Sequence, residues 1–195
     1  MLDRRQFLVK ERIAFLKLTD TWDIHDPASG AKIGEAREVI SPLAKLARLI
    51  INKRLLPTRV EVTTGVAGPP VLVMTRGVTL LHANVLVLDG QSREIGRFRS
   101  RILTIGGGFD VFDTAGFSVA EIKGDWKGWN FRFLGAGGEE LGTVTKKWAG
   151  LGQEFFTSAD NYMIALNETR ALPPDTAALL LAAGLAIDIV FKEKN

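Results

Sequence analysis

Apolar and polar residues alternate with a period of two over most of this chain. The alternation is clear over residues 22–25, 59–62, 85–87 and 131–133. Half-buried β-strands have this period, because successive side chains point to opposite faces of a sheet. Turn-forming residues separate such segments at 26–30, 68–70, 89–90, 106–108 and 135–138. The pattern predicts a mainly β protein of about twelve strands, with no linker that would divide residues 1–195 into domains.

One segment near the C-terminus breaks this period. From Ala177 to Phe191 every residue is apolar or glycine except Asp188. Two prolines precede the segment, and Asp175 or Thr176 can cap the first N–H groups of a helix. A helix that is apolar on every face must be surrounded on every face. The sequence therefore predicts a C-terminal helix that is enclosed either by protein or by lipid.

The length of the apolar run and its one charged residue indicate whether protein or lipid surrounds this helix. A helix needs roughly 20 apolar residues to span a bilayer, whereas about 10–14 are typical of a core helix. An Asp in the middle of the run adds a cost in lipid. We therefore expect the strands to wrap around this helix, with membrane insertion as the alternative. The residues expected to fill the space inside the sheet are Leu180, Leu181, Gly184, Leu185, Ile187 and Asp188.

A short pattern recurs four times along the chain, at 22–36, 87–98, 111–122 and 131–144. Each copy has a strand, a turn, an apolar residue, a small residue, any residue and a final apolar or small residue, and predicts a β-hairpin. We expect the small residue to face inward, because a wall that closes on a helix about 10–12 Å wide needs positions without bulk. The alternative is that each small residue marks a β-bulge. The four small residues are Gly34, Gly96, Ala120 and Gly142.

A second, shorter helix is predicted from Pro42 to about Asn52, with Ser41 as its cap. Its apolar side includes Leu43, Leu46, Leu49 and Ile50. Basic residues on the helix or just after it are Lys45, Arg48, Lys53 and Arg54, followed by Arg59. A basic amphipathic helix can lie on an anionic membrane surface, so this cluster is a candidate lipid-binding site. The alternative is a solvated surface whose charges pair with Asp and Glu.

A row of arginines forms a second candidate site for anions. Arg97, Arg99 and Arg101 alternate with other residues, so all three guanidinium groups fall on one face of a strand. The planar guanidinium group binds phosphate through two hydrogen bonds. Pairing with acidic residues is again the alternative.

Composition limits the available chemistry. The chain has no cysteine, and its two histidines, His25 and His82, are expected to be ordinary strand residues. Disulfides, thiolate nucleophiles and zinc–thiolate sites are therefore excluded. The motifs of P-loop NTPases, serine hydrolases and zinc proteases are missing. The sequence predicts no catalytic residue and no enzymatic activity.

Two segments in the C-terminal half carry a resemblance to a known family. Residues 142–150 and 154–162, followed by the apolar helix with Asp188, resemble the phospholipid scramblase family. Residues 26–38 are similar to the LURP-one-related and bacterial scramblase-like branch, and both groups belong to the Tubby C-terminal-like superfamily. The resemblance implies a closed antiparallel barrel of about twelve strands threaded by the hydrophobic C-terminal helix.

The chain departs from that family in two respects. It has neither the Pro-rich N-terminal region nor the Cys-rich palmitoylation stretch of scramblases. Where those proteins carry an acidic calcium segment, residues 167–175 contain only Glu168 and Asp175 as acids, with Arg170 between them. Calcium takes about six to eight oxygen ligands, so we predict no calcium site, no other metal and no cofactor.

Three functions are compatible with these features. The first is a non-enzymatic module at the membrane surface that binds an anionic phospholipid or phosphoinositide, or a protein partner. The second is a scramblase that inserts its C-terminal helix into the bilayer. The third, a nucleic-acid-binding regulator, is disfavoured because the net charge is only +3 and aromatics do not interleave with the basic residues. The apolar run at 7–9 is too short for a secretory signal, so we expect a cytoplasmic protein, peripheral at the inner membrane surface.

Overall fold

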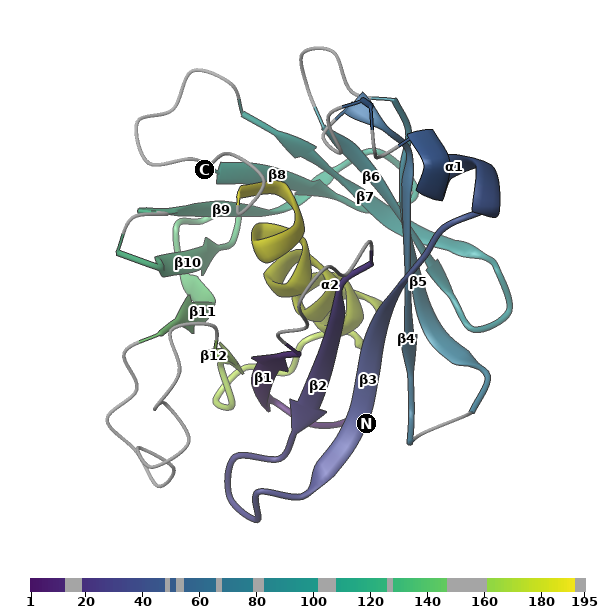
Figure 1. The fold of residues 1–195 in the computed structure, drawn as a ribbon. Helices are drawn as coiled ribbons and strands as arrows, with labels where there is room; N and C mark the ends of the chain where they lie inside the picture. The colour runs from purple at the N-terminus through teal and green to yellow at the C-terminus, as the bar shows by residue number, and fades with distance from the viewer. Residues whose placement is uncertain are drawn as a thin grey trace.

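The computed structural model of the chain describes residues 1–12, 19–47, 50–51, 55–65, 68–78, 83–101, 108–125, 128–146 and 161–191. These residues contain twelve strands and two helices. The strands form one closed antiparallel barrel, in which β1 (Gln6–Glu11) pairs with β12 (Asn161–Leu166) to complete the ring (Figure 1). The predicted fold class, a closed barrel of about twelve antiparallel strands with a helix inside, is confirmed.

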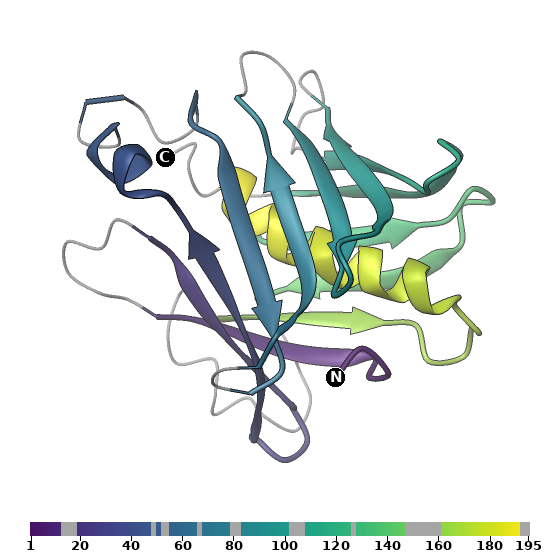
Figure 2. The ribbon, with the colours of Figure 1, turned by 90° about the vertical axis from the view of Figure 1, so that its right-hand side faces the viewer.

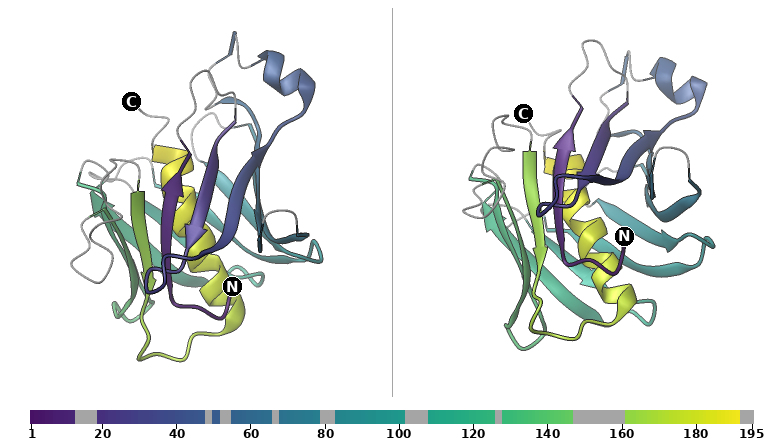
Figure 3. Two further views of the ribbon diagram at one scale, coloured as in Figure 1. Left: turned by 60° about the horizontal axis from the view of Figure 1, so that its bottom comes forward. Right: turned by 90° about the horizontal axis from the view of Figure 1, so that it is seen from below.

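Each of the other strands pairs with its neighbours in sequence. They are β2 (Thr21–His25), β3 (Lys32–Val39), β4 (Thr58–Thr63), β5 (Pro70–Arg76), β6 (Asn84–Asp89), β7 (Glu94–Ser100), β8 (Gly108–Phe112), β9 (Ser118–Asp125), β10 (Asn130–Leu134) and β11 (Glu140–Thr145). The helices are α1 (Pro42–Ala47), between β3 and β4, and α2 (Pro174–Phe191), after β12. Figures 2 and 3 show α2 running through the barrel and α1 lying outside it.

The helix α2 supplies the centre of the core. All of its residues from Ala177 to Asp188 are buried, the six predicted barrel-filling residues among them. Full burial of one Leu or Ile side chain contributes about 1.5–3 kcal/mol, so the barrel depends on this helix for much of its stability. The helix starts at Pro174, earlier than a cap at Asp175 or Thr176 predicts. Proline suits the first helical position because the N–H group it lacks would have no partner there.

All four predicted hairpins are present, and each has a β-bulge next to its small residue. In the β6–β7 pair the register skips Ile95, immediately before Gly96. The register skips the residue before each of the other three small residues in the same way. All four small residues are also buried, so the inward placement and the bulge are both correct. The small-residue pattern does not predict a fifth bulge, at Val71 in β5, because the residue after this bulge is the large Leu72.

Gly96 marks the place where the barrel wall comes closest to α2. Its φ angle is +152°, and a Cβ atom there would lie 2.4 Å from the carbonyl oxygen of Phe112 and 2.8 Å from Cδ1 of Leu179. At Gly34 the equivalent space is taken by the side chain of Met1 instead. The predicted contact between the barrel wall and the helix is therefore confirmed at Gly96. At Gly34 the side chain of Met1 fills the space beside the glycine instead.

The helix α1 is shorter than the sequence predicts. It ends at Ala47, and Ile50 and Ile51 are not helical, so the helix does not continue to Asn52. The N–H groups of Ile50 and Ile51 both donate to the carbonyl oxygen of Ala47, at 3.1 and 2.8 Å, which closes the chain into a turn. The predicted cap is present, since Oγ of Ser41 accepts the N–H group of Ala44 at 3.2 Å. A helix this short has little stability of its own.

Candidate functional site

Large apolar side chains are exposed at few places in the described chain, and most of them gather around α1. Those from the last residue of β3 to the segment before β4 are Val39, Leu46, Ile50, Ile51 and Leu55. Leu46 is 61% exposed and Ile50 is 88% exposed. Val78 extends the cluster, because it follows the end of β5 that pairs with the start of β4. We call these six apolar residues, together with Lys45 and Arg59, the α1 face.

Strand pairing brings the α1 face close to the predicted arginine row. Arg59 lies opposite Thr75, Thr75 opposite Leu86, and Leu86 opposite Arg97. None of these residues belongs to the buried core, so they form one rung across the outer wall. Adjacent strands are about 4.8 Å apart, which places Arg59 and Arg97 roughly 14 Å apart along the wall. The tertiary structure thus joins two basic regions that are well separated in the sequence.

The predicted basic cluster is only partly within the described residues. Lys45 is exposed on α1. Arg48, Lys53 and Arg54 lie outside the residues that the structure describes. Arg59 is exposed, and its Nε donates to the carboxylate of Glu61 at 2.9 Å. The cluster therefore contributes two located cations to the α1 face.

The arginine row divides into two parts. Arg97 and Arg99 are exposed on β7, and neither forms an ion pair within the described chain. Arg101, just after β7, turns toward the acidic residues of the next two strands: its Nε donates to Asp110 at 3.0 Å and its guanidinium also binds Glu121. The expected row of cations holds for the first two arginines, and the alternative of acid pairing holds for Arg101.

A groove of about 260 Å³ separates α1 from the outer wall of the barrel. The ends of β3 and β5, the start of β4 and the helix itself contribute to it. Its lining residues are Val39, Ile40, Ser41, Ala44, Pro57, Thr58, Arg59, Thr75 and Arg76. Among the residues that the structure describes, this lining includes two arginines and three residues with hydroxyl groups, and no Asp or Glu.

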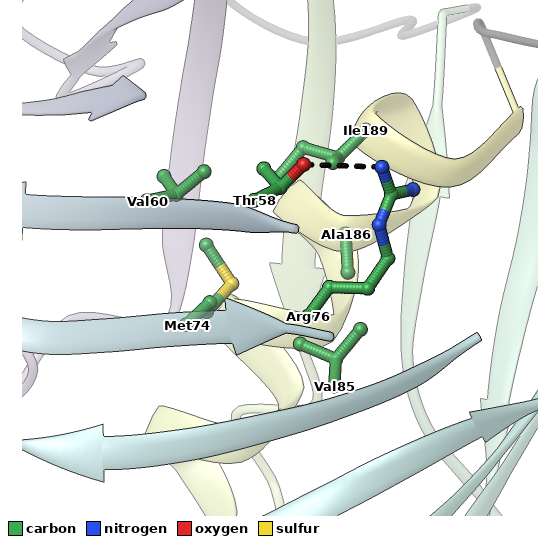
Figure 4. Close-up of a pocket in the computed structure, with 7 residues that line it drawn as sticks. All are labelled: Thr58, Val60, Met74, Arg76, Val85, Ala186 and Ile189. Atoms are coloured by element: carbon green, nitrogen blue, oxygen red, sulfur yellow. Dashed lines mark hydrogen bonds between the residues drawn. The ribbon is translucent and has the colours of Figure 1, made fainter. Parts of the chain in front are cut away.

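Arg76 forms the boundary between this groove and the barrel interior. Its side chain is 5% exposed, and one terminal nitrogen donates to Oγ1 of Thr58 at 3.1 Å (Figure 4). The same two residues also border a small apolar pocket against α2, lined by Val60, Met74, Val85, Ala186 and Ile189. That pocket has room of about 10 Å³, enough for roughly one water molecule.

The barrel interior contains a buried carboxylate that is held by a hydrogen bond. Asp188 is 4% exposed, and its Oδ2 accepts the indole N–H of Trp22 at 2.6 Å. A buried charge is costly unless it is hydrogen-bonded, so this contact stabilises α2 in one rotation inside the barrel. The sequence places Asp188 in the barrel correctly but does not reveal its donor, since Trp22 is 166 residues away.

Tyr162, on β12, also lies in this interior region. Its ring stacks on Trp129 with centroids 5.3 Å apart. Its hydroxyl is buried and has no hydrogen bond among the described residues. Burial, together with the nearby charges of Asp188 and Glu11, raises the pKa of Tyr162 well above its usual value. The phenol therefore stays neutral and serves the packing of the core.

On the outer face of β1–β3 the charges are paired instead of free. Arg12 donates to Asp23 at 2.8 Å, and Lys32 donates to Glu35 at 2.8 Å. Arg37 adds a further bond to Glu35 at 2.6 Å. Partial burial acts to raise the pKa of Asp23, but the hydrogen bonds from Arg12 and Lys32 outweigh it and lower the pKa to about 2. This region shows the paired arrangement, which within the α1 face is present only at Arg59, through its ion pair with Glu61, among the described residues.

No metal-binding group stands out in the described residues, where no three His, Cys, Asp or Glu side chains come together. Of the acids before α2, Glu168 accepts a hydrogen bond from Gln6 at 2.8 Å and Asp175 lies in the first helical turn. The expected lack of a calcium site stays a prediction. Among the helices in the described ranges, none has both the length and the apolar character to cross a membrane.

Comparison with known protein families covers the chain from β5 onward. No curated protein and no solved structure matches the chain. The sequence model of the family described as Scramblase matches residues 71–194. The matched residues run from β5 to the end of α2, so they include most of the barrel wall and the whole buried helix. The resemblance in the C-terminal half is therefore confirmed, and the chain belongs to the scramblase family.

Proposed function

We propose that this chain is a non-enzymatic barrel module that docks through the α1 face onto membranes containing anionic lipid. The observation that carries the proposal is the gathering of exposed apolar residues around α1, with Leu46 and Ile50 the most exposed of those between β3 and β4. Extended exposed apolar patches typically mark protein or membrane interaction sites. Apolar side chains with cations beside them match the interface of an anionic bilayer.

The charges favour a membrane over a protein partner as the occupant of this face. Lys45 and Arg59 lie within it, and Arg97 and Arg99 lie on the adjoining wall without acidic partners in the described chain. An anionic leaflet attracts each nearby Lys or Arg by about 1 kcal/mol. The non-enzymatic part of the proposal rests on the missing hydrolase, NTPase and metalloprotease motifs.

The position of α2 supports surface docking over insertion of that helix. The residues from Ala177 to Asp188 form the centre of the core. Moving α2 into a bilayer would empty the barrel and break the hydrogen bond between Trp22 and Asp188. Docking through the α1 face requires neither change.

Vesicle flotation tests this proposal. The protein should float with phosphatidylcholine vesicles that contain phosphatidylserine and remain behind with phosphatidylcholine alone. The double variant Leu46→Glu/Ile50→Glu should lose more than about tenfold in affinity, because two exposed apolar anchors become charged. Since both side chains are already exposed, the circular dichroism spectrum and the thermal midpoint should not change.

Phe117→Glu is the matched control. Phe117 is 71% exposed but lies in the turn between β8 and β9, at the opposite end of the barrel from α1. This variant should bind like the parent protein. Equal flotation with neutral vesicles, or undiminished binding of the double variant, would contradict docking through the α1 face.

A further inference from the structure

The two ends of the barrel expose different side chains. Antiparallel pairing places the ends of the odd-numbered strands together with the starts of the even-numbered strands. The helix α1 connects β3 to β4 at this end, which we call the α1 end, and Ile189, near the end of α2, lines the small pocket there. Six of the seven exposed large apolar residues in the described chain are those of the α1 face, and all six lie at this end.

The opposite end of the barrel has polar turns. Five of the connections there contain or adjoin an acidic residue: Asp26, Asp89, Asp113, Glu139 and Glu168. Arginines pair with three of these acids, while Asp113 and Glu168 form no ion pair within the described chain. Phe117 is the one exposed large apolar side chain described at this end. The opposite end is therefore poorly suited to an anionic bilayer, which repels unpaired carboxylates.

A second feature of the α1 end suits a membrane interface. Trp129 immediately precedes β10 and is half-buried. In the ring of twelve strands, β10 is six positions away from β4 in either direction. Trp129 and the α1 face therefore lie at the same end of the barrel, on opposite sides of its axis.

A tyrosine and a lysine both contact the ring of Trp129. The φ angle of Trp129 is +47°, a conformation that bulky residues rarely adopt. The ring lies against that of Tyr162, with centroids 5.3 Å apart, and Nζ of Lys146 is 4.2 Å from the centroid of the same Trp129 ring. Backbone strain of this kind is concentrated at functional sites. Tryptophan and lysine both suit a membrane interface, because each combines an apolar body with a polar or charged tip.

We propose that the barrel docks end-on, with the α1 face and the pair formed by Trp129 and Lys146 as its two membrane contacts. The inference rests on the proposed membrane docking and adds the orientation of the docked protein. The α1 face alone would allow the barrel to tilt, whereas two contacts on opposite sides of the axis hold that axis perpendicular to the bilayer. The end of α2 then faces the lipid, and the acidic turns face away from it.

Single-cysteine labelling tests this orientation, because the chain has no cysteine of its own. A nitrobenzoxadiazole fluorophore is attached at one of four exposed positions: Ile50→Cys in the α1 face, Asn130→Cys beside Trp129, Arg97→Cys on the outer wall and Phe117→Cys at the opposite end. The vesicles contain phosphatidylserine and phosphatidylcholine with brominated acyl chains. In the vesicle-bound protein, bromine should quench the labels at 50 and 130 and leave those at 97 and 117 unchanged.

The other quenching patterns contradict end-on docking. Quenching at 50 but not at 130 would refute the second contact while membrane docking stands, and added quenching at 97 would show that the barrel lies on its side. Quenching at all four positions would refute a single orientation. A protein that floats with no vesicle would refute both the docking and its orientation.

The charge of Lys146 gives an independent test. Lys146→Gln should weaken vesicle binding about fivefold, because an anionic leaflet attracts each cation near its surface. Arg170→Gln is the matched control, since it removes one positive charge at the opposite end of the barrel. This control should bind like the parent protein. Equal losses in the two variants would refute a contact at Lys146, because the effect of charge would then be general.

Discussion

The two helices of this protein contain similar apolar residues and have opposite environments. In α2 the side chains of Leu180 and Leu185 are buried inside the barrel, whereas Leu46 in α1 is largely exposed. The difference follows from the sequence around them. α2 is apolar on every side over many residues, while α1 is short and carries Lys45 in its last turn.

This contrast separates stability from recognition. An apolar helix inside a closed barrel contributes to the free energy of folding at nearly every residue. An exposed apolar residue contributes little to folding and remains available for a partner. Changes in the α2 region should therefore alter stability, and changes in the α1 face should alter binding while the fold stays intact.

Truncating one leucine in each helix is the most direct test of the difference between α1 and α2. Leu180→Ala should lower the free energy of unfolding by about 2–5 kcal/mol, because it leaves a cavity in the core. Leu46→Ala should change it by less than about 0.5 kcal/mol. Urea denaturation measures both. Similar losses in the two variants would mean that α1 is also part of the stabilising core.

The hydrogen bond between α2 and the wall is the next test. Trp22→Phe removes the donor to Asp188 while an aromatic ring remains, and should lower the free energy of unfolding by about 2 kcal/mol. The double variant Trp22→Phe/Asp188→Asn should recover part of that loss, since the buried charge is then gone. A double variant that is no more stable than Trp22→Phe would show that the carboxylate does not depend on this donor.

Gly96 tests how tightly the wall fits α2. Gly96→Ala should destabilise the protein by about 2 kcal/mol or more, because the added carbon would overlap the carbonyl oxygen of Phe112 and approach Leu179. Gly65→Ala is the control: its φ angle is +75° but no atom lies within 4 Å of the new carbon. That change should cost only about 1 kcal/mol, from the backbone conformation alone. Thermal or urea denaturation distinguishes the two, and equal costs would place the strain in the backbone rather than at the helix.

The paired charges on β1–β3 should give the smallest effect on stability, and one that depends on pH. The pKa of Asp23 is about 2 in the folded protein and about 3.9 in an unfolded chain. Since the folded value is lower, the ion pair stabilises fully above about pH 4, and this contribution is lost as the pH falls toward 2. We expect a loss of about 1–2 kcal/mol from this residue, reduced from the full shift by solvent screening.

Urea denaturation across this acidic range measures the effect. Asp23→Asn should flatten the dependence, although Glu35 leaves a residual slope because its pKa is lowered in the same direction. A profile identical to that of the parent protein would mean that other carboxylates dominate acid unfolding.

Much of the barrel could be predicted because its features are local. The alternation of apolar and polar residues gives the strands, and the continuous apolar run from Ala177 gives the enclosed helix. The repeated small residue also reveals four bulges. The fifth is hidden because Leu72 stands in the small position, and a bulge depends on the register between two strands, not on one residue.

The candidate site is harder to predict because it depends on contacts between distant segments. Lys45 and Arg59 are visible as a basic cluster, and the sequence already places an apolar side on α1. The length of α1 is overestimated, since its periodic pattern continues past the turn at Ile50. Nothing local marks Arg76 as a groove residue, because its neighbours there come from β3, α1 and β4.

The sequence by itself determines the mainly β class, the buried C-terminal helix, the hairpin repeat and the scarcity of catalytic residues, because each of these depends on residues close together in the chain. The tertiary structure alone decides that Trp22 binds Asp188, that Arg59 and Arg97 share one outer rung, and that Arg76 donates to Thr58 at the edge of the groove beside α1. The physical reason is closure of the barrel. Closure fixes the register of every strand against its neighbours, and so it sets which distant side chains come within reach of one another.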